Sequence, residues 1–314
     1  MLRGFMSKAP RSDKSGPQDE SPTGSRIRRS RIIQPDTPLE LREAPGSAEF
    51  SKMKTAEMRA AFLIGDLFLP GETRMLCWQS DRAIIGAAVP RRKALALPSP
   101  RELAAAYFTQ RRELGVVNIG GIGSVTIGLN EIILGEREAV YIGRGNPDIR
   151  FSSKDAANPA QFYFVSYPAH ATYPCAKIEK ARMESTECGS APGCNRRTIH
   201  KMIHPAGVAS CQLTMGLTRL AEASIWNTMP AHTHGRRSEI YLYFDLPKDG
   251  IVVHCMGEPK ETRHIIMRDR QVVLSPSWSL HFGAGTTNYS FIWAMGGENQ
   301  EFADMDGVPM EALM

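Results

Sequence analysis

The chain has 314 residues and a mass of 34.7 kDa, which is long enough for two domains or one large duplicated domain. Its composition, 42% hydrophobic and 23% charged, excludes a fibrous or wholly disordered protein, and no stretch approaches the roughly 20 apolar residues of a membrane-spanning helix. The net charge of +5 lies in residues 1–34, which carry 8 basic and 3 acidic side chains, whereas residues 35–314 carry 30 of each. The neutral body gives no support for nucleic-acid binding.

Residues 1–43 are rich in Ser, Pro, Gly and Arg and have almost no apolar periodicity. Such a segment cannot bury enough surface to offset its ordering entropy, so we expect a disordered extension; a genuine extension and a misplaced start codon both fit this composition. A short helix is expected around residues 51–60. The six cysteines form no C-x-x-C pair and no secretory signal is evident, which predicts reduced thiols in a cytoplasmic protein.

The rest of the sequence has the pattern of an all-β chain, because short apolar runs are separated by Gly, Pro and Asn. The predicted strands are 83–89, 115–119, 124–127, 139–142, 161–165, 211–215, 239–244, 251–254, 264–267, 271–274 and 289–293. Strands spaced this closely indicate sandwiches or barrels. Residues 137–143 resemble residues 270–276, so we expect two copies of one β unit. The polar stretch 176–195 is interpreted as the linker between them.

The segment 230–239 holds the strongest candidate for a metal site. His232 and His234 are two residues apart, so on an extended strand both imidazoles point the same way. Glu239 follows after a glycine and a polar run, which permit a bend that turns this carboxylate inward. His281, ahead of a later strand, is a fourth candidate. Three imidazoles and one carboxylate suit zinc, iron, manganese or nickel and leave positions for substrate oxygens.

This pattern resembles the metal signature of the cupins, although cupins usually have glycine where Trp278 stands and asparagine where Gly285 stands. The sequence is more similar to the 5-keto-4-deoxyuronate isomerases of pectin breakdown, a cupin subgroup that shares those departures. The resemblance covers nearly everything from about residue 40 onward. It is carried by residues 111–121 (RRELGVVNIGG), 168–174 (PAHATYP), 195–199 (NRRTI), 226–230 (WNTMP), 261–264 (ETRH), 276–279 (PSWS) and 297–300 (GENQ).

The resemblance implies two jelly-roll cupin domains, an N-terminal one at residues 44–175 and a C-terminal one at residues 196–314, commonly assembled as a hexamer. It also implies one zinc ion per chain in the C-terminal cupin. The implied ligands are His232, His234, Glu239 and His281.

The internal repeat predicts that the N-terminal cupin holds no metal. An offset of 133 residues places Asp148 at the position of His281, and the zone corresponding to the H-x-H pair contains no histidine. His170 is interpreted as a turn or interface residue.

The implied reaction converts 5-dehydro-4-deoxy-D-glucuronate to 3-deoxy-D-glycero-2,5-hexodiulosonate, an aldose–ketose isomerisation with no nucleic-acid or membrane partner. A divalent cation on the carbonyl and the adjacent hydroxyl would stabilise the cis-enediolate that forms. The sequence does not identify the general base; Glu258 and Glu261 are candidates but also fit solvated turn carboxylates.

The carboxylate of the substrate calls for a fixed bidentate donor, which favours arginine over lysine. The candidates are Arg237, Arg263, Arg196 and Arg197.

Two other functions stay open at this stage. An iron-dependent cupin dioxygenase would use the same ligand types. A non-enzymatic, sugar-sensing cupin would place its basic tail on nucleic acid, although no helix-turn-helix pattern supports it.

Overall fold

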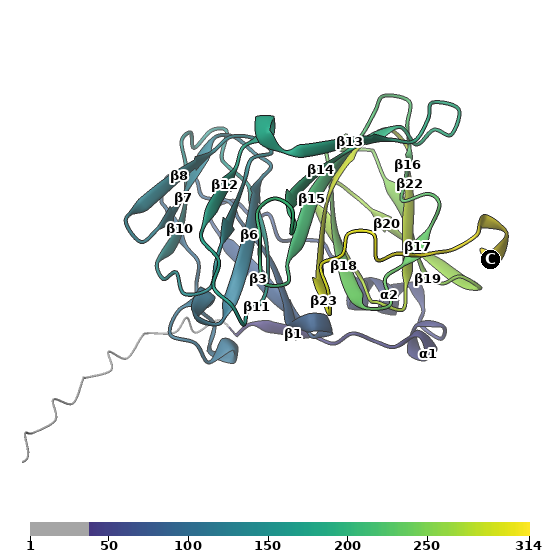
Figure 1. The fold of residues 1–314 in the computed structure, drawn as a ribbon, viewed down its shortest axis with the longest axis horizontal. Coiled ribbons are helices and arrows are strands. Elements are labelled where there is room, and N and C mark those ends of the chain that lie inside the picture. Colours follow the sequence, from purple (N-terminus) through teal and green to yellow (C-terminus); the bar gives the residue numbers. More distant parts are fainter. Residues whose placement is uncertain (1–37) are drawn as a thin grey trace, which may run out of the picture. The chain divides into compact units, whose positions relative to one another are not determined.

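The computed structural model describes residues 38–314, which fold almost entirely into β-strands (Figure 1). The predicted all-β jelly-roll class is confirmed, and every predicted apolar run overlaps an observed strand. The predicted extension lies outside the described residues as far as position 37. No helix in residues 38–314 is long and apolar enough to cross a membrane.

A seven-stranded sheet and a four-stranded sheet come mainly from the first half of the chain. The larger contains, in spatial order, β1 (Glu40–Arg42), β3 (Thr73–Trp78), β4 (Ala83–Ala88), β11 (Phe162–Pro168), β6 (Arg112–Asn118), β9 (Ala139–Ile142) and β12 (Ala176–Ile178). The smaller contains β5 (Leu95–Ala96), β10 (Ile149–Ser153), β7 (Gly123–Ile127) and β8 (Asn130–Leu134).

The second half repeats this arrangement. Its seven-stranded sheet contains β13 (Glu184–Cys188), β14 (Arg197–Ile203), β15 (Thr214–Leu220), β23 (Ser290–Gly297), β18 (Arg237–Phe244), β21 (Gln271–Ser275) and β2 (Leu63–Ile64). Its four-stranded sheet contains β16 (Trp226–Asn227), β22 (Leu280–Gly285), β19 (Val252–Glu258) and β20 (Glu261–Met267), and β17 (His232–Thr233) pairs with β24 (Asp306–Gly307).

The predicted sequence repeat falls on equivalent strands. Strands β6 and β9 are neighbours in the first large sheet, and β18 and β21 are neighbours in the second. The repeated segments lead into β9 and β21, and each begins with an arginine in the left-handed region, Arg137 at φ 65° and Arg270 at φ 60°. The two halves are therefore built on one strand order.

The large sheets are buried on both faces. In β11, Phe162 and Phe164 pack on Phe151 of the small sheet, with ring centroids 5.3 and 6.0 Å apart. Tyr163 and Val165, which point the other way, belong to a second cluster that also contains residues of the second large sheet. A strand with two buried faces has a continuous apolar run instead of an alternating one, which explains the sequence pattern.

The two large sheets meet where small residues let them approach closely. A Cβ atom on Gly115 of β6 would clash with Leu213 and with Met215 of β15, and one on Gly296 of β23 would clash with the ring of Tyr167. The ring of Tyr167 cannot move aside as the flexible ends of Leu213 and Met215 can, so packing between the halves requires glycine at position 296 more strictly than at position 115.

The structure differs from the sequence predictions at the start of the chain. Within the predicted disordered stretch, residues 40–42 form β1, which pairs in parallel with β3, and the preceding Leu39 is buried. Strand β1 is too short to show a pattern in the sequence. Its backbone pairing with β3 and the buried side chain of Leu39 hold it in place. The single expected helix is two, α1 (Ser47–Phe50) and α2 (Thr55–Phe62).

The predicted domain boundaries do not coincide with the sheets. Strand β2, within the predicted N-terminal domain, pairs with β21 of the second large sheet. The predicted linker 176–195 contains β12, which pairs with β9, and β13, which pairs with β14. Its polar composition is that of two strands at sheet edges, and the chain passes from the first half to the second between them.

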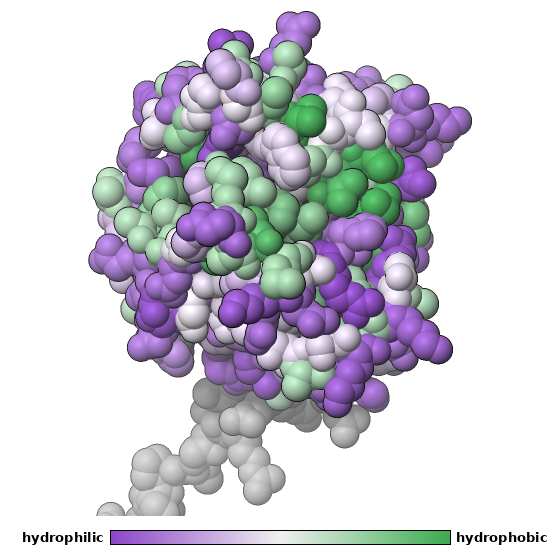
Figure 2. Space-filling model, turned by 90° about the vertical axis from the view of Figure 1, so that its right-hand side faces the viewer, coloured by the Kyte–Doolittle hydropathy of each residue, from purple (hydrophilic) through white to green (hydrophobic). Residues whose placement is uncertain are grey.

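On the face drawn in Figure 2, apolar residues gather in an area among polar ones. The large hydrophobic side chains that are exposed in residues 38–314 include Leu41, Ile122, Leu129, Ile133, Met305, Met310 and Met314. Single exposed apolar side chains are common, whereas a contiguous area is typical of an interface.

Glu113 of β6 joins the two halves through a buried carboxyl group. Its oxygens accept hydrogen bonds from the hydroxyl of Tyr141 (2.8 Å) and from the backbone N–H groups of residues 211, 212 and 213 (2.6, 2.8 and 2.8 Å). The side chain is fully buried, so its removal leaves these buried donors without their acceptor.

Replacement of Glu113 by alanine is expected to lower the free energy of unfolding by at least about 3 kcal/mol, because each hydrogen bond to a charged group contributes about 1.5–3 kcal/mol. Urea denaturation followed by fluorescence measures the change. Glu131→Ala, an exposed glutamate on β8, is the control and should change it by less than about 0.5 kcal/mol. Equal losses in the two variants would show that Glu113 does not hold the halves together.

Candidate metal centre

Three strands and one turn bring the predicted ligands together. His232 lies on β17, and Glu239 lies in β18, where it pairs with Ser275 and Met295. Between them the chain turns, and the N–H of Arg237 donates to the carbonyl of His234 (3.0 Å). This is the bend that the sequence permits, and it places Glu239 on the same side as the two histidines.

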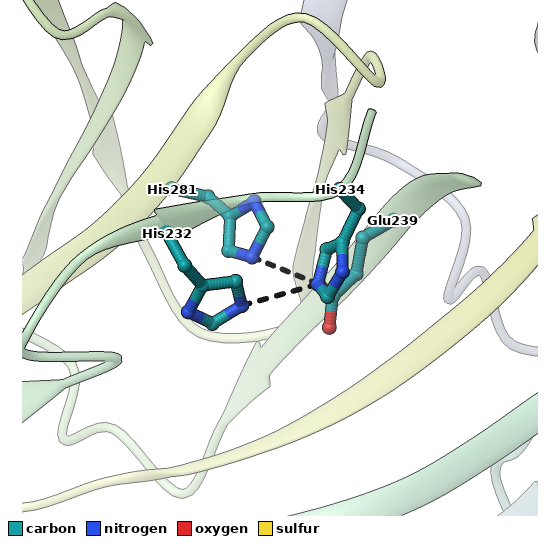
Figure 3. A group of neighbouring side chains, drawn as sticks. All are labelled: His232, His234, Glu239 and His281. Carbon is teal, nitrogen blue, oxygen red and sulfur yellow. Dashed lines mark hydrogen bonds and ion pairs between the residues drawn. The ribbon is translucent and has the colours of Figure 1, made fainter. Parts of the chain in front are cut away.

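The four side chains converge on one point, as Figure 3 shows. His281, on β22, completes the group, and one potential ligand atom from each residue lies within 4.8 Å of the others. The Nε2 atoms of His232 and His234 are 3.1 Å apart, and Oε2 of Glu239 is 3.0 Å from Nε2 of His234 and 2.8 Å from Nε2 of His281.

Outer contacts orient two of the imidazoles. Nδ1 of His234 lies 2.9 Å from the carbonyl oxygen of Asp304, and Nδ1 of His281 lies 3.2 Å from the hydroxyl of Ser275. An Nδ1–H that donates outward leaves the lone pair of Nε2 directed into the cluster, which is the form that binds a metal.

Burial and mutual contact shift the pKa values within the cluster. Burial and the nearby His281 lower the pKa of His232 to about 3, so this imidazole stays neutral. Burial works against the charged form of Glu239 as well, but His281 and His234 hold the pKa of this carboxylate well below its usual value. Burial likewise opposes the charged form of His234, yet the hydrogen bond to Glu239 outweighs it and raises the pKa of His234.

The donor set fits a metal ion. Nε2 of His281 is buried and, despite its short distance from Glu239, has no aligned hydrogen bond in the described part of the chain. A buried nitrogen of this kind needs a partner. Three imidazoles and one carboxylate around a single point provide the ligands that zinc and other transition metals take in proteins.

A cavity of about 330 Å³ opens beside the cluster. His232, His234 and Glu239 form one part of its wall. The rest is largely apolar, with a few polar groups: Cys188, Arg197, Ile199, Thr218, Thr228, Met229, Pro230, Tyr241, Phe291, Trp293, Met295, Phe302 and Met305. A cavity of this size, apolar with a few convergent polar groups, is typical of a small-molecule site.

Of the four predicted arginines, only Arg197 lines this cavity. Its Nη1 atom donates to the carbonyl of Asn195 (2.9 Å). Arg237 is buried behind His234, where its Nη2 donates to the carbonyl of Asp304 (2.9 Å), so it supports a ligand and does not face the cavity.

The remaining candidates lie elsewhere. Arg196 is exposed outside the lining residues. Arg263 donates to the carbonyl of Phe50 (3.1 Å) and lies 5.8 Å from the centre of that ring, so α1 holds it. Glu258 and Glu261 are exposed and face each other across the β19–β20 turn.

Sequence reasoning did not identify Tyr241. It follows Glu239 by two residues on β18, lines the cavity, and packs edge-on against His281 with ring centres 5.2 Å apart. Burial raises its pKa well above the usual value, so its hydroxyl remains a hydrogen-bond donor at neutral pH. The two-residue periodicity of a strand could have identified Tyr241, because alternate residues such as 239 and 241 point to the same face.

The first half has different residues at the corresponding positions. Leu114 pairs with Ile142 as Glu239 pairs with Ser275, and positions 142 and 275 are related by the repeat offset. Leu114 therefore stands where the glutamate stands in the second half. Asp148, at the position of His281, is an exposed residue in the left-handed region.

Jelly-roll sheets with a His/Glu cluster beside an internal cavity define a cupin-type protein with a candidate metal centre. The sequence profile of the KduI/IolB family matches residues 69–308. The chain belongs to this family.

Close relatives match over their full length. The 4-deoxy-L-threo-5-hexosulose-uronate ketol-isomerase of Caldicellulosiruptor bescii is 49% identical over 275 residues, covering 88% of this chain and 100% of the relative. The enzyme of the same name from Lachnoclostridium phytofermentans is 50% identical over 275 residues, with the same coverage.

Solved structures share the fold at low identity. An IolB-like protein of Salmonella typhimurium superimposes with a TM-score of 0.66 at 15% identity, covering 79% of this chain and 96% of that chain. An oxalate decarboxylase superimposes with a TM-score of 0.51 at 10% identity, covering 72% and 71%. These two similarities bear on the fold alone.

His281→Ala is expected to reduce bound divalent metal by at least about tenfold, since it removes one of four ligands. Elemental analysis of purified protein measures the metal content. His264→Ala, an exposed histidine on β20, is the matched control and should keep the metal. Equal metal content in the two variants would contradict the ligand assignment.

Proposed function

We propose that the protein is an aldose–ketose isomerase that converts 5-dehydro-4-deoxy-D-glucuronate to 3-deoxy-D-glycero-2,5-hexodiulosonate in pectin and uronate breakdown. The observation that carries the proposal is the His/Glu cluster in the wall of a cavity of about 330 Å³. Relatives named as ketol-isomerases, nearly half identical over their whole length, support the reaction class.

The metal in this proposal is one zinc ion per chain. His232, His234, Glu239 and His281 would hold it. A divalent cation at this point supplies Lewis acidity toward the carbonyl of an open-chain sugar, whose α-proton is otherwise hard to remove.

Arg197 and Tyr241 are proposed to bind the substrate. Arg197 is the one arginine among the residues that line the cavity, and a guanidinium group suits a carboxylate because it donates two parallel hydrogen bonds. Tyr241 keeps its proton and so donates a hydrogen bond to a substrate oxygen where negative charge develops. The apolar wall excludes water from the reacting carbons.

The general base remains unassigned in this proposal. Glu239 is the only carboxylate among the lining residues, and it is proposed as a metal ligand whose low pKa does not suit a base. Glu258 and Glu261 are outside the wall.

The assembly is proposed to be a hexamer and the compartment the cytoplasm. The apolar area on the surface in Figure 2 supports association with further copies. Sedimentation velocity measures the mass of the assembly, and a monomer at micromolar concentration would contradict the proposed hexamer.

The direct test is to incubate purified protein with 5-dehydro-4-deoxy-D-glucuronate and follow ketose formation. Turnover should disappear on chelation and return with zinc. Absence of turnover by the zinc-loaded protein would contradict the proposal. Oxygen consumption by an iron-loaded sample would point to a dioxygenase instead.

Arg197→Lys is expected to raise KM by about tenfold with a smaller change in kcat, because lysine keeps the charge but loses the paired donors. Steady-state kinetics separate the two constants. Arg196→Lys, the neighbouring exposed arginine, is the control and should behave as wild type. An unchanged KM in Arg197→Lys would remove this residue from the substrate site.

Tyr241→Phe is expected to lower kcat by about tenfold or more while the metal stays bound, because the ring still packs on His281 but the donor is lost. Tyr243→Phe is the control: this hydroxyl bonds Nδ1 of His254 (2.8 Å) and does not line the cavity. A similar kcat for the two variants would argue against a role of Tyr241 in the reaction.

A further inference from the structure

A second cavity, of about 330 Å³, lies at one end of the first large sheet. It is formed where β6 begins and β11 ends, so it joins two segments that carry the family resemblance, 111–121 and 168–174. Neither segment contributes to the candidate metal centre. Four arginines line this cavity: Arg82, Arg111, Arg112 and Arg144.

Three of these arginines, Arg111, Arg112 and Arg144, are oriented by neutral acceptors. Nη2 of Arg111 donates to the carbonyls of residues 103 and 104 (2.7 and 2.8 Å), and Nη1 of Arg144 donates to those of residues 169 and 170 (3.1 and 3.3 Å). Arg112 is only 7% exposed and donates from Nε to the hydroxyl of Ser166 (3.1 Å) and from Nη2 to its carbonyl (2.8 Å). Carbonyl and hydroxyl oxygens fix a guanidinium group without neutralising its charge.

Each arginine also keeps a donor that is not used. In residues 38–314 no hydrogen bond is made by Nη1 of Arg112, by Nη2 of Arg144, by Nη1 of Arg111 or by any side-chain nitrogen of Arg82. Burial lowers the pKa of Arg112 to about 10, which still leaves it charged at neutral pH. The Nη1 atom of Arg112 is not among the fully buried unpaired atoms, so this donor is accessible to an anion that enters the cavity.

The only acidic side chain among the lining residues does not supply that anion. Glu102 accepts from Nε of Arg101 (3.0 Å) and from the N–H of Leu39 (3.1 Å), so its oxygens are already engaged. None of the four arginines forms a salt bridge within residues 38–314.

The internal repeat places this cavity at the end of the fold that carries the metal centre in the second half. Arg112 lies two residues before Leu114, and Arg237 lies two residues before Glu239, so the two buried arginines occupy the same register. In the second half, Arg237 supports the ligand His234. The equivalent end of the first half has arginines in place of metal ligands.

We infer that this cavity binds a small multivalent oxyanion, a molecule that carries a phosphate group or two carboxylates. The net positive charge of the wall and the several unused N–H donors match the oxygens of such groups, which arginine binds in pairs. The site is separate from the candidate metal centre and does not depend on the proposed isomerase activity.

Isothermal titration calorimetry of the full chain with inorganic phosphate, malonate and acetate tests the inference. Phosphate or malonate should bind at millimolar concentrations or below, and acetate at least about tenfold more weakly, since one carboxylate engages fewer donors. Whichever of phosphate and malonate binds more tightly identifies the chemical class of the anion. Arg82→Gln and Arg144→Gln should each weaken binding by at least about tenfold, whereas Arg92→Gln, which removes an exposed charge outside the cavity, should not.

Arg82→Gln is the variant that should disturb the fold least, because the Arg82 side chain makes no hydrogen bond in the described residues. Its melting temperature should equal that of the wild type. Binding that survives both cavity variants would place the anion elsewhere, for example on the metal, and would overturn the inference. Absence of binding by every probe would also overturn it. In that case, a changed sedimentation coefficient for Arg144→Gln would show that a carboxylate of a second copy fills the cavity.

Discussion

The contact of one buried carboxylate with two imidazoles determines how this part of the molecule is built. Glu239 is only 5% exposed, and a buried charge is costly unless cationic or metal partners surround it. Its position at the start of a central strand between β21 and β23 fixes its direction. His234 and His281 reach it from a turn and from the facing sheet, so both sheets must keep their register for the cluster to exist.

Other parts of the chain maintain that register. Asp81 accepts hydrogen bonds from the N–H (3.2 Å) and hydroxyl (2.5 Å) of Ser238, next to Glu239, although Asp81 has a left-handed φ of 48°. Trp278, in the loop before His281, packs on Phe50 of α1 with ring centres 5.2 Å apart. The N-terminal helices and the first half therefore hold the two ends of the site, which is why the predicted domain boundaries do not follow the sheets.

The sequence was sufficient for features set by short-range spacing. The strands with buried faces and the H-x-H pair are visible as local patterns, because periodicity along one strand decides which side chains share a face. The sequence was insufficient to predict contacts between residues on different sheets. Asp304 orients His234 through a backbone carbonyl, which any residue type provides, and nothing in the local sequence separates Arg197 from Arg237. Three-residue strands such as β1 are likewise fixed by their partner and not by their own composition.

The two halves illustrate how one strand order carries two kinds of charge. At equivalent ends of the fold, the second half gathers imidazoles around a carboxylate, and the first half gathers four arginines that form no salt bridge with the one carboxylate in their cavity, Glu102. Leu114 in place of Glu239 removes the charge that would attract a cation. Without it, the only acidic side chain in the wall is Glu102, which forms no salt bridge with Arg112, and the chemistry of that end changes from a cation site to an anion site. Differences at the ligand positions, Leu114 in place of Glu239 and Asp148 in place of His281 among them, thus separate the roles of two β units that share one strand order.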